Sequence, residues 1–93
     1  MKVEVHVPGP LVAYTNGQGV VNLEVDGSTV KDALGVLWSL HPRLRDRLLD
    51  EQGRVRRHVN LFVDRESIRD TGGLDTPLAP GAVLSVIPAV SGG

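Results

Sequence analysis

Two adjacent glycines, Gly92 and Gly93, are the residues best suited to chemistry, because they end a tail of small residues. Glycine has no Cβ, so such a tail can enter a narrow channel and adopt backbone angles closed to other residues. A terminal carboxyl has a pKa of about 3.5, so it is an anion at neutral pH. Because an anion is a poor electrophile, another enzyme must activate it. The alternative interpretation is a frayed end or a cloning remnant. The elements that carry the tail must decide between the two.

The side chains before the tail offer little chemistry of their own. Cysteine is absent, which excludes a disulfide, a thiolate metal site and a cysteine nucleophile. The histidines His6, His41 and His58 lack the spacing of metal ligands, so we expect no metal site. The net charge of −1, with acids and bases interspersed, argues against a nucleic-acid partner. The one basic cluster, residues 54–58, is interpreted as a solvated approach to a strand.

The length and polarity of the chain predict one cytoplasmic domain. Ninety-three residues are enough for a single modest core. Charged residues interrupt the first apolar run, which is not typical of a signal peptide. No apolar stretch approaches the roughly 20 residues that span a bilayer, so we expect no membrane partner.

Hydrophobic periodicity predicts the order strand, strand, helix, strand, short strand, strand. Alternation of apolar and polar residues marks the strands, and apolar residues at helical spacing mark the helices. The main helix begins at a capping box formed by Thr29 and Asp32, with Ser28 as an alternative cap, and it ends at His41-Pro42. The predicted strands are residues 2–7, 21–25, 59–63, 67–69 and 82–87, and the predicted helices are residues 30–40 and 42–49.

This order predicts an α+β domain of the β-grasp, or ubiquitin-like, type. A mixed sheet of four to five strands would pack on one main helix, with a short second helix beside it. The first and last strands would lie side by side in the middle of the sheet. We expect residues 1–87 to form this domain and residues 88–93 to form a flexible tail that ends in the diglycine.

Three segments resemble one family in particular. They are residues 58–63 (HVNLFV), residues 69–74 (RDTGGL) and residues 86–93 (VIPAVSGG). The chain resembles the ubiquitin-like sulfur carriers, which include the small subunit of molybdopterin synthase and the carriers of thiamine and cysteine biosynthesis. The pair Gly72-Gly73 before a leucine and the PAVSGG ending look most like the cysteine-biosynthesis carrier.

The resemblance implies that the chain is not an enzyme but a protein co-substrate. An E1-like adenylating enzyme would use ATP and magnesium to adenylate Gly93, and a sulfur donor would convert it to a thiocarboxylate. A pyridoxal-phosphate (PLP) cysteine synthase would take up the sulfur, and a JAMM-type metalloprotease would release the product. All these cofactors belong to the partners.

Strand parity predicts a docking surface for such partners. Leu84, Val86, Leu61 and Val63 should face the core, which leaves alternate residues on the open face of the sheet. Fully extended, residues 88–93 reach roughly 20 Å at about 3.3 Å per residue, enough to enter a buried site. Incomplete burial, or cover from residues 54–58, is the alternative. The predicted docking residues are Phe62, Ser85, Ile87, Ala89, Val90 and Ser91.

Three other functions stay open. The chain could be a stable subunit of molybdopterin synthase, which would copurify with a large catalytic subunit. It could modify lysines through Gly93, which would leave isopeptide-linked Gly-Gly remnants. Finally, it could be a plain interaction module that works without Gly93.

Overall fold

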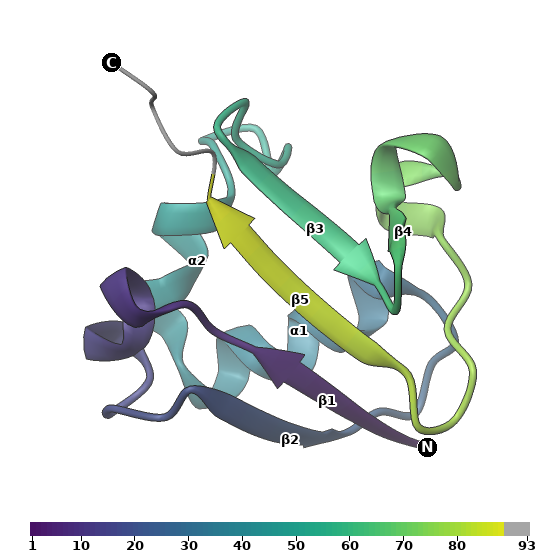
Figure 1. Cartoon of the computed structure of the whole chain (residues 1–93), viewed down its shortest axis with the longest axis horizontal. Helices are drawn as coiled ribbons and strands as arrows, with labels where there is room; N and C mark the ends of the chain where they lie inside the picture. The colour runs from purple at the N-terminus through teal and green to yellow at the C-terminus, as the bar shows by residue number, and fades with distance from the viewer. Residues whose placement is uncertain (89–93) are drawn as a thin grey trace.

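A five-stranded mixed sheet packs against one main helix in the computed structural model of this chain, which describes residues 1–88 (Figure 1). The strand order across the sheet is β2-β1-β5-β3-β4. The strands are β1 (Lys2–His6), β2 (Val20–Glu24), β3 (Val59–Val63), β4 (Glu66–Ser67) and β5 (Val83–Pro88). The α-helices are α1 (Val30–Leu40) and α2 (Pro42–Leu48), and the 3₁₀ helices are η1 (Gly9–Tyr14), η2 (Ile68–Asp70) and η3 (Gly73–Asp75).

The first and last strands lie side by side in the middle of the sheet, as the sequence predicts. β1 and β5 are parallel, with Val5 opposite Leu84, whereas β3 runs antiparallel to β5 with Leu61 opposite Val86. β1 and β2 form an antiparallel pair. The β-grasp arrangement is therefore confirmed.

Alternate residues of the sheet build the core. Val5 and Leu84 are fully buried, and Leu61 and Val86 are nearly so. Val63, also predicted to be buried, is half-buried and packs against the edge of the core. The apolar stripe of α1 covers this face of the sheet with Val30, Ala33, Leu34 and Leu37.

The predicted capping box starts α1. The hydroxyl oxygen of Thr29 accepts a hydrogen bond from the N–H of Asp32 at 3.3 Å, and the Asp32 carboxylate accepts from the N–H of Thr29 at 3.1 Å. α2 then begins directly at Pro42, because proline lacks only an N–H that a first helical residue leaves unpaired anyway. Leu44 and Leu48 of α2 are fully buried on the same side, as expected.

Three local features differ from the sequence prediction. The connection from β1 to β2 contains η1, which ends at Tyr14. The guanidinium groups of Arg43 and Arg47 of α2 lie over the Tyr14 ring, with their Cζ atoms 5.4 and 4.7 Å from the ring centroid. The short edge strand is only two residues long, because the chain turns into η2 to bury Ile68. β5 also includes Pro88, one residue beyond the predicted end.

The pair Gly72-Gly73 sets the conformation of the backbone where η3 begins. Both residues have left-handed φ angles, +113° and +63°, which side-chain-bearing residues rarely adopt. Within residues 1–88, no helix is long and apolar enough to cross a membrane.

Candidate functional site

The end of β5 places the root of the predicted reactive tail at the centre of the sheet. Pro88, the last described residue, lies opposite Val59 of β3, and Ile87 lies opposite Asn60. β5 has β1 on its other side, so the chain leaves the domain from an interior strand (Figure 1). The predicted site residues Ala89, Val90, Ser91, Gly92 and Gly93 lie outside the described residues, so their roles stay predictions.

The structure brings the other three predicted docking residues together on the open face of the sheet. Phe62 lies directly opposite Ser85, and Ile87 is the diagonal neighbour of Phe62 across the same two strands. Ile87 is 46% exposed, whereas Phe62 and Ser85 are half-buried. Residues 54–58 therefore leave Ile87 accessible. Partner binding at this surface, which we call the Phe62–Ile87 patch, stays a prediction.

A polar pair borders this patch on the side of β1. His6 is the register partner of Ser85, and its Nε2 lies 2.7 Å from the Glu4 carboxylate oxygen. Both side chains are nearly half exposed. The sequence reasoning did not place them there, although the alternation of β1 puts His6 and Glu4 on the open face.

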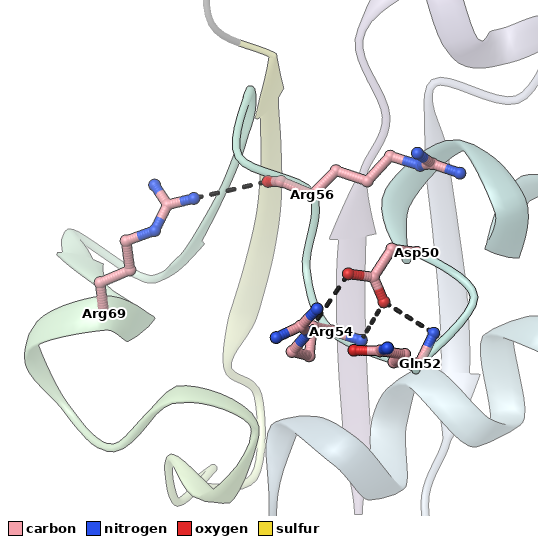
Figure 2. A network of polar contacts seen from close by, with 5 residues as sticks. All are labelled: Asp50, Gln52, Arg54, Arg56 and Arg69. Atoms are coloured by element: carbon pink, nitrogen blue, oxygen red, sulfur yellow. Dashed lines mark hydrogen bonds and ion pairs between the residues drawn. The ribbon is translucent and has the colours of Figure 1, made fainter.

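Arg69 is a second residue that the sequence reasoning missed. Its guanidinium donates hydrogen bonds to the Asn60 side-chain oxygen and to the backbone carbonyls of Val59 at 3.0 Å and Arg57 at 3.3 Å. A longer contact of 3.5 Å reaches the carbonyl of Arg56 (Figure 2). Arg69 therefore fixes the chain where β3 begins, next to the tail root. Because most of its partners are backbone carbonyls, no pattern of residue types signals this role.

Asp50 organises the turn that precedes this region. Its carboxylate accepts hydrogen bonds from the N–H groups of Gln52 at 2.9 Å and Arg54 at 3.0 Å, and it contacts the Arg54 guanidinium at 3.3 Å (Figure 2). The N–H of Arg54, followed by that of Gln52, lowers the pKa of Asp50 below its ordinary value. The turn thereby holds residues 54–58 in a defined path.

These residues surround an open hollow of about 500 Å³ in the segment that leads into β3. Its lining residues are Asp50, Arg54, Val55, Arg56, Arg57 and His58. Within residues 1–88, no three histidine or carboxylate side chains gather closely enough to hold a metal ion. The described part of the site thus consists of this hollow and the Phe62–Ile87 patch.

A mixed sheet of this order over one main helix, with the last strand at its centre, defines a ubiquitin-like β-grasp domain. The sequence profile of the ThiS family matches residues 5–93. The chain belongs to this family of ubiquitin-like sulfur carriers, as its resemblance predicts.

Individual relatives agree with this assignment over all or most of the chain. The sulfur carrier protein CysO of Mycobacterium tuberculosis is 35% identical over 95 residues, which cover 100% of each chain. The small archaeal modifier protein 1 of Haloferax volcanii is 35% identical over 83 residues, or 88% of this chain and 91% of the relative.

A solved structure shows the same similarity in three dimensions. The crystal structure of the Amycolatopsis orientalis BexX/CysO complex contains a chain that matches with a TM-score of 0.87 and 34% identity, over 98% of this chain and 99% of that one. That relative was therefore captured together with a protein partner.

Proposed function

We propose that this protein carries sulfur as a thiocarboxylate on Gly93 and donates it in the biosynthesis of cysteine or a related sulfur metabolite. The observation that carries the proposal is the match to the mycobacterial CysO over the full length of both chains. The root of the tail on the central strand and the open hollow and patch around it agree with a body that presents its terminus to partner enzymes.

The chemistry takes place at the carboxyl carbon of Gly93. A carboxylate oxygen attacks the α-phosphate of ATP, pyrophosphate leaves, and the acyl adenylate forms in an E1-like enzyme that holds ATP and magnesium. A hydrosulfide equivalent then attacks the acyl carbon, and AMP departs with the original oxygen. The sulfur of the thiocarboxylate that remains is a stronger nucleophile than the carboxylate oxygen that it replaces.

The partners supply every cofactor in this scheme. In the cytoplasm, a PLP-dependent cysteine synthase would join the thiocarboxylate sulfur to the carbon of its amino-acid acceptor, which gives a thioester with Gly93. An acyl shift from sulfur to the amine would then leave cysteine amide-linked to Gly93, and a JAMM-type metalloprotease would hydrolyse that amide, which releases cysteine and restores the Gly93 carboxylate. The chain itself contributes presentation: α1 and the sheet hold β5, and β5 holds the root of the tail at Pro88 opposite Val59.

Intact-mass spectrometry tests the proposal directly. The protein is incubated with ATP, magnesium, sulfide and the E1-like adenylating enzyme of the same organism. The expected result is the mass gain of one oxygen replaced by one sulfur, confined to the C-terminal peptide. No gain under conditions in which pyrophosphate release shows adenylation would refute the thiocarboxylate.

Two controls make the mass change specific. Oxidation of Met1, the single methionine, adds nearly the same mass, so the gain must be located by fragmentation. A variant without Gly93 should show no ATP-dependent gain at all. If the variant gains the same mass, the change lies elsewhere in the chain.

A second function, modification of other proteins, is favoured by the 35% identity to an archaeal modifier protein. In that case the acyl adenylate reacts with a lysine amine and not with sulfide. Tryptic remnants that consist of residues 70–93 on lysines of cellular proteins, lost in a strain that carries the variant without Gly93, would support this function, because Arg69 is the last trypsin site before Gly93. If these remnants are absent while the thiocarboxylate forms, sulfur transport would be the function that remains.

A further inference from the structure

The charges of this chain are separated along its length, although the net charge is only −1. Residues 43–58 contain six of the ten lysines and arginines but only three of the eleven acids. Their formal charge is therefore +3, which leaves −4 for the rest of the chain. The six arginines are Arg43, Arg45, Arg47, Arg54, Arg56 and Arg57.

The fold turns this segment toward the root of the tail. Val59, which follows it directly, lies opposite Pro88, and a bridge between Leu49 and Val55 folds the segment back on α2. α2 itself rests on Tyr14 of η1, which follows the end of β1 on the same side of the molecule (Figure 1). We call residues 43–58 the basic end.

The opposite end of the sheet carries acids. β1 and β5 are parallel, so both begin at the end of the sheet that lies away from the tail. β2 is antiparallel to β1 and therefore ends there. β3 also ends there, since it is antiparallel to β5. The exposed acids at these strand ends are Glu24, Asp26, Asp64 and Glu66. Lys2, Arg65 and the N-terminal ammonium, which lies 3.5 Å from the Glu24 carboxylate, balance most of these acids, so the excess positive charge lies in the basic end.

Part of the basic end is engaged within the domain, and part is free to meet a partner. Arg54 contacts Asp50, and Nε of Arg56 donates to the carbonyl of Asp46 at 2.9 Å. Arg57 and His58 are exposed, and within residues 1–88 their side chains make neither a hydrogen bond nor an ion pair. Arg57 therefore carries an exposed positive charge at the hollow, two residues before Val59, the register partner of Pro88.

We propose that the basic end docks on an acidic rim around the channel through which the activating enzyme receives the tail. This inference rests on the proposed function. Beyond Pro88, five residues span at most roughly 17 Å at about 3.3 Å each, so the surface around the tail root must approach the mouth of the channel. That surface is positive, and a complementary acidic mouth both attracts the domain and orients it with the tail forward.

A nucleic acid is the other polyanion that a basic surface could bind. The interspersed acids Asp46, Asp50 and Glu51 oppose a continuous phosphate backbone, and the whole chain is weakly acidic. A protein rim with discrete carboxylates fits this alternating pattern better. Binding to RNA is therefore kept as an outcome of the test that would overturn the proposal.

The experiment compares two arginines that differ in position and not in kind. Arg57→Glu reverses one charge at the basic end, and Arg65→Glu makes the same change at the opposite end of the sheet, where Arg65 is also exposed. Association of each variant with the E1-like adenylating enzyme is measured by stopped-flow fluorescence at low and high salt. At low salt, Arg57→Glu should slow association about fivefold and Arg65→Glu should leave it unchanged. The wild-type rate should fall as salt rises, because screening weakens the attraction.

Each outcome decides one question. Equal rates for the two variants, or a wild-type rate independent of salt, would overturn the acidic rim even if the thiocarboxylate forms. If Arg57→Glu slows association and the wild-type rate falls with salt, but no ATP-dependent pyrophosphate release occurs, the acidic rim would be supported and the proposed chemistry refuted. Failure of the wild type to associate would refute both. Tighter binding of a single-stranded RNA oligonucleotide than of the enzyme at the same salt would assign the basic end to nucleic acid instead.

Discussion

The Arg69 guanidinium hydrogen-bonds the side-chain oxygen of Asn60, the residue that faces Ile87 across the β3–β5 ladder. The same guanidinium holds the carbonyls of Arg57 and Val59. One side chain from η2 thus links the edge of the Phe62–Ile87 patch to the basic end. The two surfaces that we assign to partner binding are therefore fixed relative to each other and to the tail root.

Replacing Arg69 should loosen this link. Arg69→Ala removes several hydrogen bonds and leaves the carbonyls to water, so we expect the free energy of unfolding to fall by roughly 1–2 kcal/mol. Arg69→Lys should recover only part of this loss, because a lysine ammonium lacks the planar fork that reaches several acceptors at once. Urea denaturation measures both. Arg65→Ala is the matched control, and an equal loss there would show that Arg69 has no special role.

The Phe62–Ile87 patch should matter for activation and not for folding. The double variant Phe62→Ser, Ile87→Ser removes apolar contact area from the open face, so we expect the KM for adenylation to rise about tenfold with kcat nearly unchanged. Thermal melting checks that the fold persists. Val20→Ser is the control, since Val20 is 47% exposed on the same face but two strands from β5. An unchanged KM in the double variant would remove this patch from the docking surface.

Acid should weaken the fold through Asp32 and Asp50. The N–H of Ser28, then the hydroxyl and N–H of Thr29, lower the pKa of Asp32 in the folded state. The Arg54 and Gln52 N–H groups lower that of Asp50. A carboxyl whose pKa is lower in the folded state stabilises the fold above its unfolded pKa of about 3.9, and this contribution disappears as the pH falls through the folded value.

Urea midpoints measured from neutral pH down to about pH 3 test this expectation. The wild type should lose stability progressively below about pH 4, and the variant Asp32→Asn, Asp50→Asn should lose less over the same interval because two of the titrating groups are gone. Superimposable pH profiles, after the neutral-pH offset is subtracted, would show that these carboxylates are not coupled to folding.

Gly72 should resist substitution because of its backbone angle. With φ at +113°, an alanine there is strained even though its Cβ would meet only ordinary contacts, the nearest at 3.7 Å from the backbone nitrogen of Thr76. We expect Gly72→Ala to cost about 1–3 kcal/mol in chemical denaturation. Gly9→Ala, at a position with no left-handed angle and no atom within 4 Å, should change stability little. A similar effect of the two substitutions would argue against strain at Gly72.

Local sequence rules predicted the elements that periodicity alone defines. The alternation of valines in β1, the stripe of α1 and the pairing of Thr29 with Asp32 each depend on residues close in sequence, and all three are confirmed. Strand parity likewise placed Phe62, Ser85 and Ile87 on one face.

The features that were missed depend on contacts between distant residues. η1 packs on α2 through Tyr14 and two arginines about 30 residues away. β4 is short because the chain turns after Ser67 to bury Ile68 in the core. Arg69 binds carbonyls, which every residue type possesses, so its partners carry no signature in the sequence. The basic end also escapes local reasoning, because its position beside Pro88 exists only once β3 and β5 have paired.

The parallel contact between β1 and β5 also has a consequence for how the protein forms. Val5 and Leu84 are register partners 79 positions apart, so the centre of the sheet closes only after nearly the whole chain is available. Contacts of such high sequence separation slow folding, and any nick that detaches β5 leaves β1 and β3 without the strand between them. A chain that has lost β5 therefore loses the centre of its sheet together with Pro88, the root of the tail, whereas removal of residues beyond Pro88 leaves all five strands in place.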